Sequence, residues 1–143
     1  MNLETQLDDR IEKIDIDSNL IKNSLNLAKR DIDTAKSLLL DSNFDWAYAI
    51  SYNGMLQAAR ALMFYSGYRP KGSEQHLTVI EYIKFNFSDK FTESELFLLN
   101  KSRKKRHLIV YEMVDLVSEQ EAENSICLAK KFISKVENII KLK

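Results

Sequence analysis

Only three glycines and one proline occur among the 143 residues of the chain. Tight turns between strands depend on glycine, proline and similar residues, so this sequence cannot supply the turns of a β-sandwich or a β-barrel. A doubly wound α/β fold is disfavoured as well, because the chain has no glycine-rich phosphate loop. Apolar residues make up 45% of the chain, which is enough for a packed core in one domain. The composition therefore predicts long helices with few connections.

The spacing of apolar residues predicts the first helix. These residues recur at alternating steps of three and four, which is the spacing of one helix face. The stripe consists of Leu7, Ile11, Ile14, Ile21, Leu25, Ala28, Ile32, Ala35 and Leu39. The polar cluster at residues 15–18 favours helix caps over helix interiors. We therefore interpret residues 1–17 as an acidic N-terminal leader, which either is itself helical or precedes a helix from about Ser18 to Leu40.

Caps and helix breakers delimit the rest of the chain. A second helix is predicted from about Phe44 to Ser66; it is apolar on most sides, which indicates a central element ended by Gly67. Segment 67–72 is the clearest loop, and Ser73 is predicted to cap a third helix. Two capping boxes are predicted at helix starts. The first begins a fourth helix, which extends to about Val114, and the second begins a fifth helix. The two boxes are Thr92 with Glu95 and Ser118 with Glu121. The sequence thus predicts an all-α fold, an up-and-down antiparallel bundle of four to five helices.

Several classes of protein are disfavoured by what the sequence contains. A single cysteine, Cys127, excludes an internal disulfide framework and paired-cysteine zinc sites. Residues 1–9 are polar and acidic, unlike a signal peptide, and no apolar run is long enough for a membrane span. We therefore expect a cytoplasmic protein without a membrane partner. The acidic residues are scattered without a metal-ligand motif, so no metal and no cofactor is expected.

The most unusual segment is the basic run 101–107, because the 21 basic and 21 acidic residues of the chain balance. Its permanently basic residues are Lys101, Arg103, Lys104, Lys105 and Arg106. One interpretation is an exposed loop or a solvated stretch of helix. The other is a nucleic-acid-binding patch that holds phosphates. If the segment is helical, Arg103 and Arg106 share a face with Leu99 and Val110, and they need anionic partners there.

Three further polar residues could belong to a site. His107 lies among cations that disfavour its charged form, so a neutral imidazole could act as a base in RNA cleavage. His76, at the start of an apolar helix face, is interpreted as structural. Arg60 is the only charged residue between Trp46 and Ser66. We interpret it as forming a salt bridge or lying at the rim of the bundle, and the alternative is that it lines a ligand cleft or a dimer contact.

Taken together, these segments resemble the HEPN domain family over roughly residues 20 to 140. Residues 27–39 resemble the first HEPN helix, and the alanine- and tyrosine-rich residues 47–63 resemble the second. His76, shortly after the glycine loop, fits the family too. Residues 103–111 resemble the late helix that carries the family signature. This resemblance implies a helical bundle, commonly a homodimer.

The resemblance also implies a choice of functions. Many members are metal-independent ribonucleases, including toxins paired with a minimal nucleotidyltransferase, and others bind RNA or nucleotides without catalysis. The catalytic signature is an arginine, four to six residues and a histidine. Here Arg106 is followed at that spacing by Tyr111, and only three residues separate Arg103 from His107. Tyrosine, with a pKa near 10, is a poor base at neutral pH.

We therefore expect RNA or nucleotide binding without standard ribonuclease activity. The protein would then belong to a toxin–antitoxin or defence-type system. One alternative is a metal-independent endoribonuclease that uses Arg103 or Arg106 with His107, and with Tyr111 in the signature position. Another is a protein-interaction module that docks on an acidic partner such as a nucleotidyltransferase.

Overall fold

The computed structural model describes residues 9–141, and within this range it contains five helices and two short strands. The helices account for most of the chain, so the predicted all-α bundle is confirmed. In chain order the elements are β1 (Ile11–Lys13), α2 (Ser18–Leu40), α3 (Phe44–Tyr65), β2 (Tyr68–Pro70), α4 (Gln75–Asn86), α5 (Glu93–Tyr111) and α6 (Glu119–Lys141).

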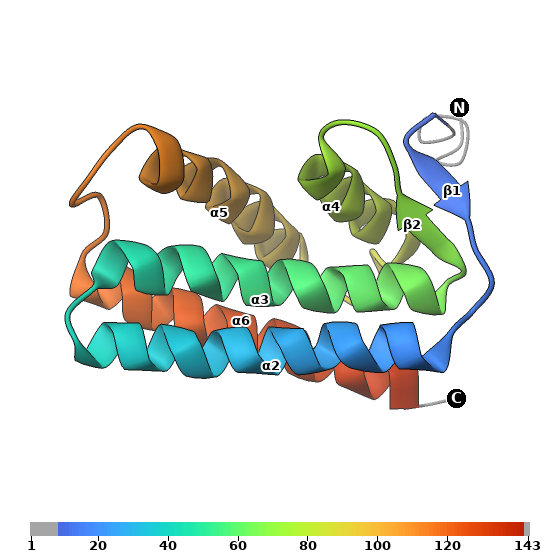
Figure 1. The fold of residues 1–143 in the computed structure, drawn as a ribbon, viewed down its shortest axis with the longest axis horizontal. Coiled ribbons are helices and arrows are strands. Elements are labelled where there is room, and N and C mark those ends of the chain that lie inside the picture. Colours follow the sequence, from blue (N-terminus) through green and yellow to red (C-terminus); the bar gives the residue numbers. More distant parts are fainter. Residues whose placement is uncertain (1–8, 142–143) are drawn as a thin grey trace.

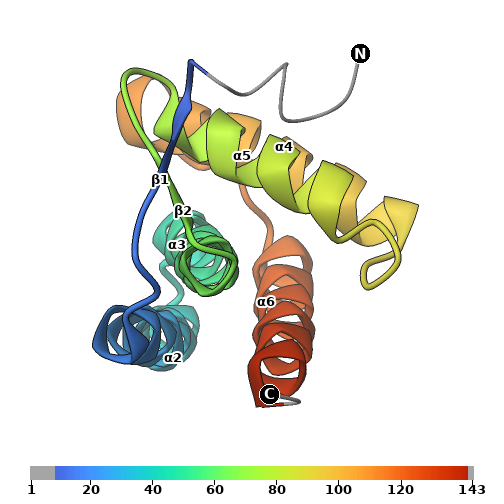
Figure 2. The same cartoon turned by 90° about the vertical axis from the view of Figure 1, so that its right-hand side faces the viewer.

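Helix α3 is the central element. It contacts α2, α4, α5 and α6, and its residues Tyr52, Met55 and Leu62 are fully buried. Helices α2, α3 and α6 extend along the long axis of the molecule (Figure 1). Helices α4 and α5 lie side by side and cross on one side of α3 and α6 (Figure 2). The start of α4 and the second half of α5 are thereby brought to the same central helix.

Glycine at position 54 of α3 lets α2 approach closely. A Cβ atom added at Gly54 would lie 3.2 Å from the backbone oxygen of Ala28 and 3.1 Å from Ile32 Cδ1. These separations are tighter than ordinary van der Waals contact, so a side chain at this position would have to displace its neighbours on α2.

Local signals predicted most helix ends correctly. The side chain of Asp17 caps α2, Gly67 follows α3 with φ +88°, and both predicted capping boxes are formed. Two predictions were wrong by small shifts. The N-cap of α4 is Glu74, in the left-handed conformation, rather than Ser73. Helix α5 ends at Tyr111 because the backbone turns there, three residues before the predicted end.

The leader is not helical in the part that the structure describes. Residues 1–8 lie outside the described residues, and Ile11–Lys13 form strand β1, which pairs antiparallel with β2. The backbone amide of Ile14 donates to the Gly67 oxygen (2.9 Å), and that of Lys71 donates to the Arg10 oxygen (2.8 Å). A side chain adds to this contact, since Arg10 forms a bidentate ion pair with Glu81 on α4. The leader thus braces the loop that leads into α4.

None of the helices within residues 9–141 combines the length and the apolar character that a membrane crossing requires.

Candidate functional site

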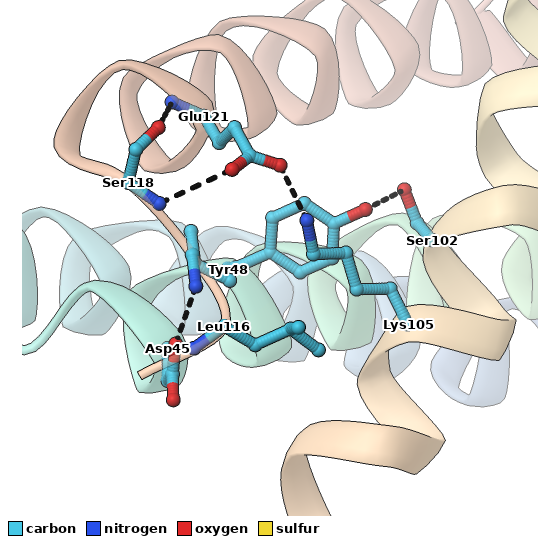
Figure 3. Close-up of polar contacts among 8 residues, drawn as sticks. Asp45, Tyr48, Ser102, Lys105, Leu116, Ser118 and Glu121 are labelled. Carbon is cyan, nitrogen blue, oxygen red and sulfur yellow. Dashed lines mark hydrogen bonds and ion pairs between the residues drawn. The ribbon is translucent and has the colours of Figure 1, made fainter. Parts of the chain in front are cut away.

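The basic run is helical along its whole length, so the interpretation as a loop is wrong. Its side chains therefore leave α5 in different directions, and two of them anchor the helix. Ser102 is buried and accepts a hydrogen bond from the Tyr48 hydroxyl of α3 (3.2 Å). Lys105 forms an ion pair with Glu121 of α6, and its ammonium lies 5.4 Å from the centroid of the Tyr48 ring (Figure 3). Lys105 is thus already neutralised.

The connection from α5 to α6 is fixed by a carboxylate. Asp45, in the first turn of α3, accepts hydrogen bonds from the backbone amides of Leu116 (2.9 Å) and Val117 (2.8 Å) (Figure 3). Ser118 and Glu121 then cap α6 reciprocally. These contacts and the two anchors on α5 set the rotation of that helix about its axis.

Four of the predicted site residues face solvent. They are Lys101, Lys104, His107 and Tyr111. The rings of His107 and Tyr111 lie against each other with centroids 4.9 Å apart.

Arg103 and Arg106 are partly buried, as their shared face with Leu99 predicts. A third arginine, Arg60 of α3, joins them near His76 at the start of α4, whose pKa is lowered by burial first and then by the charges of all three arginines. The guanidinium of Arg60 also donates to the side-chain oxygen of Gln75 (3.3 Å). Three helices thus bring three arginines and a histidine together, and we name these four residues the arginine cluster.

Charge pairing separates this cluster from the other arginines of the chain. Arg10, Arg30 and Arg69 each pair with a carboxylate. The three cluster arginines form no ion pair with any carboxylate in the part of the chain that the structure describes. Within residues 9–141 Arg60 therefore lacks the predicted salt bridge, and its guanidinium is partly buried.

Two of the cluster guanidiniums are incompletely satisfied. The Nε atoms of Arg60 and Arg106 are buried and have no hydrogen-bond partner, whereas Arg103 Nε donates to Asn100 Oδ1 (3.1 Å). Buried polar groups are almost always hydrogen-bonded, so such atoms are a reason to look for an absent partner. The missing partner must be an acceptor, and the surrounding charge favours an anion.

His76 is held neutral and oriented. Burial and then the charges of Arg106, Arg60 and Arg103 lower its pKa. The hydroxyl oxygen of Tyr52, which is fully buried on α3, lies 3.2 Å from His76 Nδ1. Burial raises the pKa of the Tyr52 hydroxyl. A buried O–H has to donate, and Nδ1 is its hydrogen-bond partner. We therefore assign the imidazole proton to Nε2, which makes that nitrogen a donor.

Sequence reasoning placed Arg103 and Arg106 on one face but did not include His76 and Arg60 in the predicted site. The available signal was Arg60 itself, a lone charge on an otherwise apolar helix. Within residues 9–141 no group of three histidine, cysteine, aspartate or glutamate side chains is arranged to hold a metal ion.

Comparison with curated proteins found no match. The family model of the HEPN domain matches residues 21–139, which includes all five helices except the first turn of α2 and the last residues of α6. All four residues of the arginine cluster lie inside the matched region. By the extent of this match, the chain belongs to the HEPN domain family.

Proposed function

We propose that this HEPN domain binds RNA or a nucleotide, and that the arginine cluster holds a phosphate group of the ligand. The observation that carries the proposal is the convergence of Arg60, Arg103 and Arg106 on His76, with none of the three in an ion pair with a carboxylate among the described residues. Three uncompensated guanidiniums repel one another, so an anion that enters between them gains more here than on an ordinary basic surface.

The donor chemistry matches phosphate. Guanidinium groups bind phosphate oxygens in a bidentate manner, and the cluster offers three of them. His76 adds its Nε2–H, and it is the second residue of α4. The amino end of a helix carries partial positive charge and free amides, which also favour an anion. The N-cap of α4 is Glu74, whose side chain is exposed and makes no capping hydrogen bond, and no acidic residue occupies the first turn itself.

The state of His76 favours binding over ribonuclease chemistry. A general base must accept a proton, but in the tautomer assigned above Nδ1 is engaged with the Tyr52 hydroxyl and Nε2 carries the proton. The residues at the signature positions, His107 and Tyr111, are exposed and contact each other. These features support a site that holds a phosphate without activating a ribose hydroxyl.

Two matched double variants on α5 test the proposal. Arg103→Gln with Arg106→Gln removes two cluster guanidiniums, and Lys101→Gln with Lys104→Gln removes the same charge from the exposed side of the same helix. Binding is measured by fluorescence anisotropy with an octauridylate that carries a 5′-phosphate and a 3′-fluorescein. Each charge-assisted hydrogen bond contributes about 1.5–3 kcal/mol, so the arginine variant should bind at least about a hundredfold more weakly.

The lysine variant should bind within about threefold of the wild type, since exposed lysines contribute through screened electrostatics alone. Equal losses in the two variants would show that the whole basic run acts as a diffuse patch, and would refute a site at the cluster. Thermal unfolding of each variant checks that the fold is intact.

A further inference from the structure

The charge of the arginine cluster selects among phosphates, and this inference rests on the proposed function. We infer that the cluster takes a terminal phosphate monoester, as found on a nucleotide or at the end of a strand, in preference to the internal phosphodiesters of RNA. The argument uses charge balance, the number of acceptor oxygens and the enclosure of the site.

Charge balance comes first. The three guanidiniums carry three positive charges, and all three act on both Tyr52 and His76. An internal phosphodiester brings one negative charge and leaves two positive charges uncompensated. A terminal monoester carries nearly two negative charges at pH 7, since its second pKa is near 6. The terminal group therefore removes more of the mutual repulsion of the arginines.

The number of acceptor oxygens also favours a terminal phosphate monoester. A diester offers two non-bridging oxygens, whereas a terminal monoester offers three strong acceptor oxygens. The cluster presents donors from three helices: Arg60 from α3, His76 from α4, and Arg103 with Arg106 from α5. Donors that converge from three directions are matched by a group with three acceptor oxygens better than by one with two.

The burial of the cluster also favours a terminal phosphate over an internal phosphodiester of a strand. All four side chains of the cluster are partly buried, and the Nε atoms of Arg60 and Arg106 are inaccessible to solvent. Tyr52 lies directly behind His76, with ring centroids 5.8 Å apart, and closes the inner side. An internal phosphodiester carries a nucleoside on each side and needs space for both, whereas a terminal phosphate needs space for one.

The test compares two oligonucleotides that differ in one group. An octauridylate with a 5′-phosphate and one with a 5′-hydroxyl, both labelled with fluorescein at the 3′ end, are titrated with the full chain at one fixed ionic strength. The phosphorylated strand should bind about tenfold tighter or more, the change that one additional charge-assisted hydrogen bond gives. This preference should disappear in Arg103→Gln with Arg106→Gln and persist in Lys101→Gln with Lys104→Gln.

Competition identifies the source of the phosphate. Uridine 5′-monophosphate should displace the phosphorylated strand, and uridine should not. If uridine 5′-monophosphate competes as well as the unlabelled phosphorylated strand, the ligand is a free nucleotide; if it competes more weakly, the ligand is a strand end. Either result supports a terminal phosphate.

The results that would contradict the preference for a terminal phosphate differ from those that would contradict the proposed function. Equal affinity for the two strands, lost in the arginine variant, would overturn the preference for a terminal phosphate and leave the proposed function standing. If neither strand binds, the proposed function and this inference both fall. A preference that survives in the arginine variant would place the recognition of the terminal phosphate elsewhere on the chain.

Discussion

Replacing Arg106 by methionine should stabilise the free protein while it weakens phosphate binding. The buried Nε of Arg106 has no partner within residues 9–141, and a buried unsatisfied donor costs about 1–3 kcal/mol. Removing one of three clustered positive charges adds a contribution of the same sign. Methionine keeps the aliphatic contacts of the arginine stem and is a good helix former, so little packing is lost.

The expected gain in the free energy of unfolding is about 1–2 kcal/mol, which raises the Tm of a chain of this length by about 3–8 °C. Differential scanning calorimetry without ligand measures this shift, and the anisotropy assay measures the loss of binding. Lys104→Met, on the exposed side of the same helix, is the control and should change the free energy of unfolding by less than about 0.5 kcal/mol. A lower Tm for Arg106→Met would refute the reasoning, because it would mean that the guanidinium has a structural partner.

Three other perturbations have definite expected results. Asp45→Ala leaves two backbone amides without their acceptor and should lower the free energy of unfolding by about 3 kcal/mol in urea titrations, whereas Asp45→Asn keeps an acceptor oxygen and should lose about half as much. Gly54→Val should destabilise by about 1–3 kcal/mol, since a Cβ there already meets Ala28 and Ile32 too closely; wild-type stability would contradict the close approach of α2 and α3. The lowered pKa of His76 means that the unfolded chain binds more protons between that pKa and the ordinary value of 6.5. Stability should therefore fall as the pH drops below 6.5, and His76→Gln should show less of this fall in urea titrations at several pH values; an unchanged pH dependence would argue against a neutral, buried imidazole.

Local chemistry determined which parts of the fold could be predicted from sequence. The capping boxes at Thr92 and Ser118 consist of residues three positions apart, so the sequence alone shows them. The strand pair β1–β2 was missed because three residues are too few to show alternation and β2 contains the only proline. Its pairing is a tertiary property that joins segments more than fifty positions apart.

The candidate site was predicted only where one helix carries it. Arg103 and Arg106 are three positions apart on α5, so their common face followed from helical spacing. Arg60 and His76 come from two other helices, and only the crossing of α4 over α3 brings them to the same place. A sequence shows which residues share a face but does not show which faces meet. For this reason the sequence left Arg60 between a salt bridge, a place at the rim and a ligand cleft, and within residues 9–141 it forms no salt bridge.

The brace between β1 and the loop before α4 bears on how the domain should be isolated. The family match begins at residue 21, yet the segment before it holds the loop that leads into α4 through Gly67 and Lys71, and Arg10 pairs with Glu81 on α4, the helix that carries His76. A fragment cut to residues 21–139 would keep every arginine of the cluster and lose the support that sets the position of its histidine. The smallest unit that retains the site is therefore longer than the unit that defines the family.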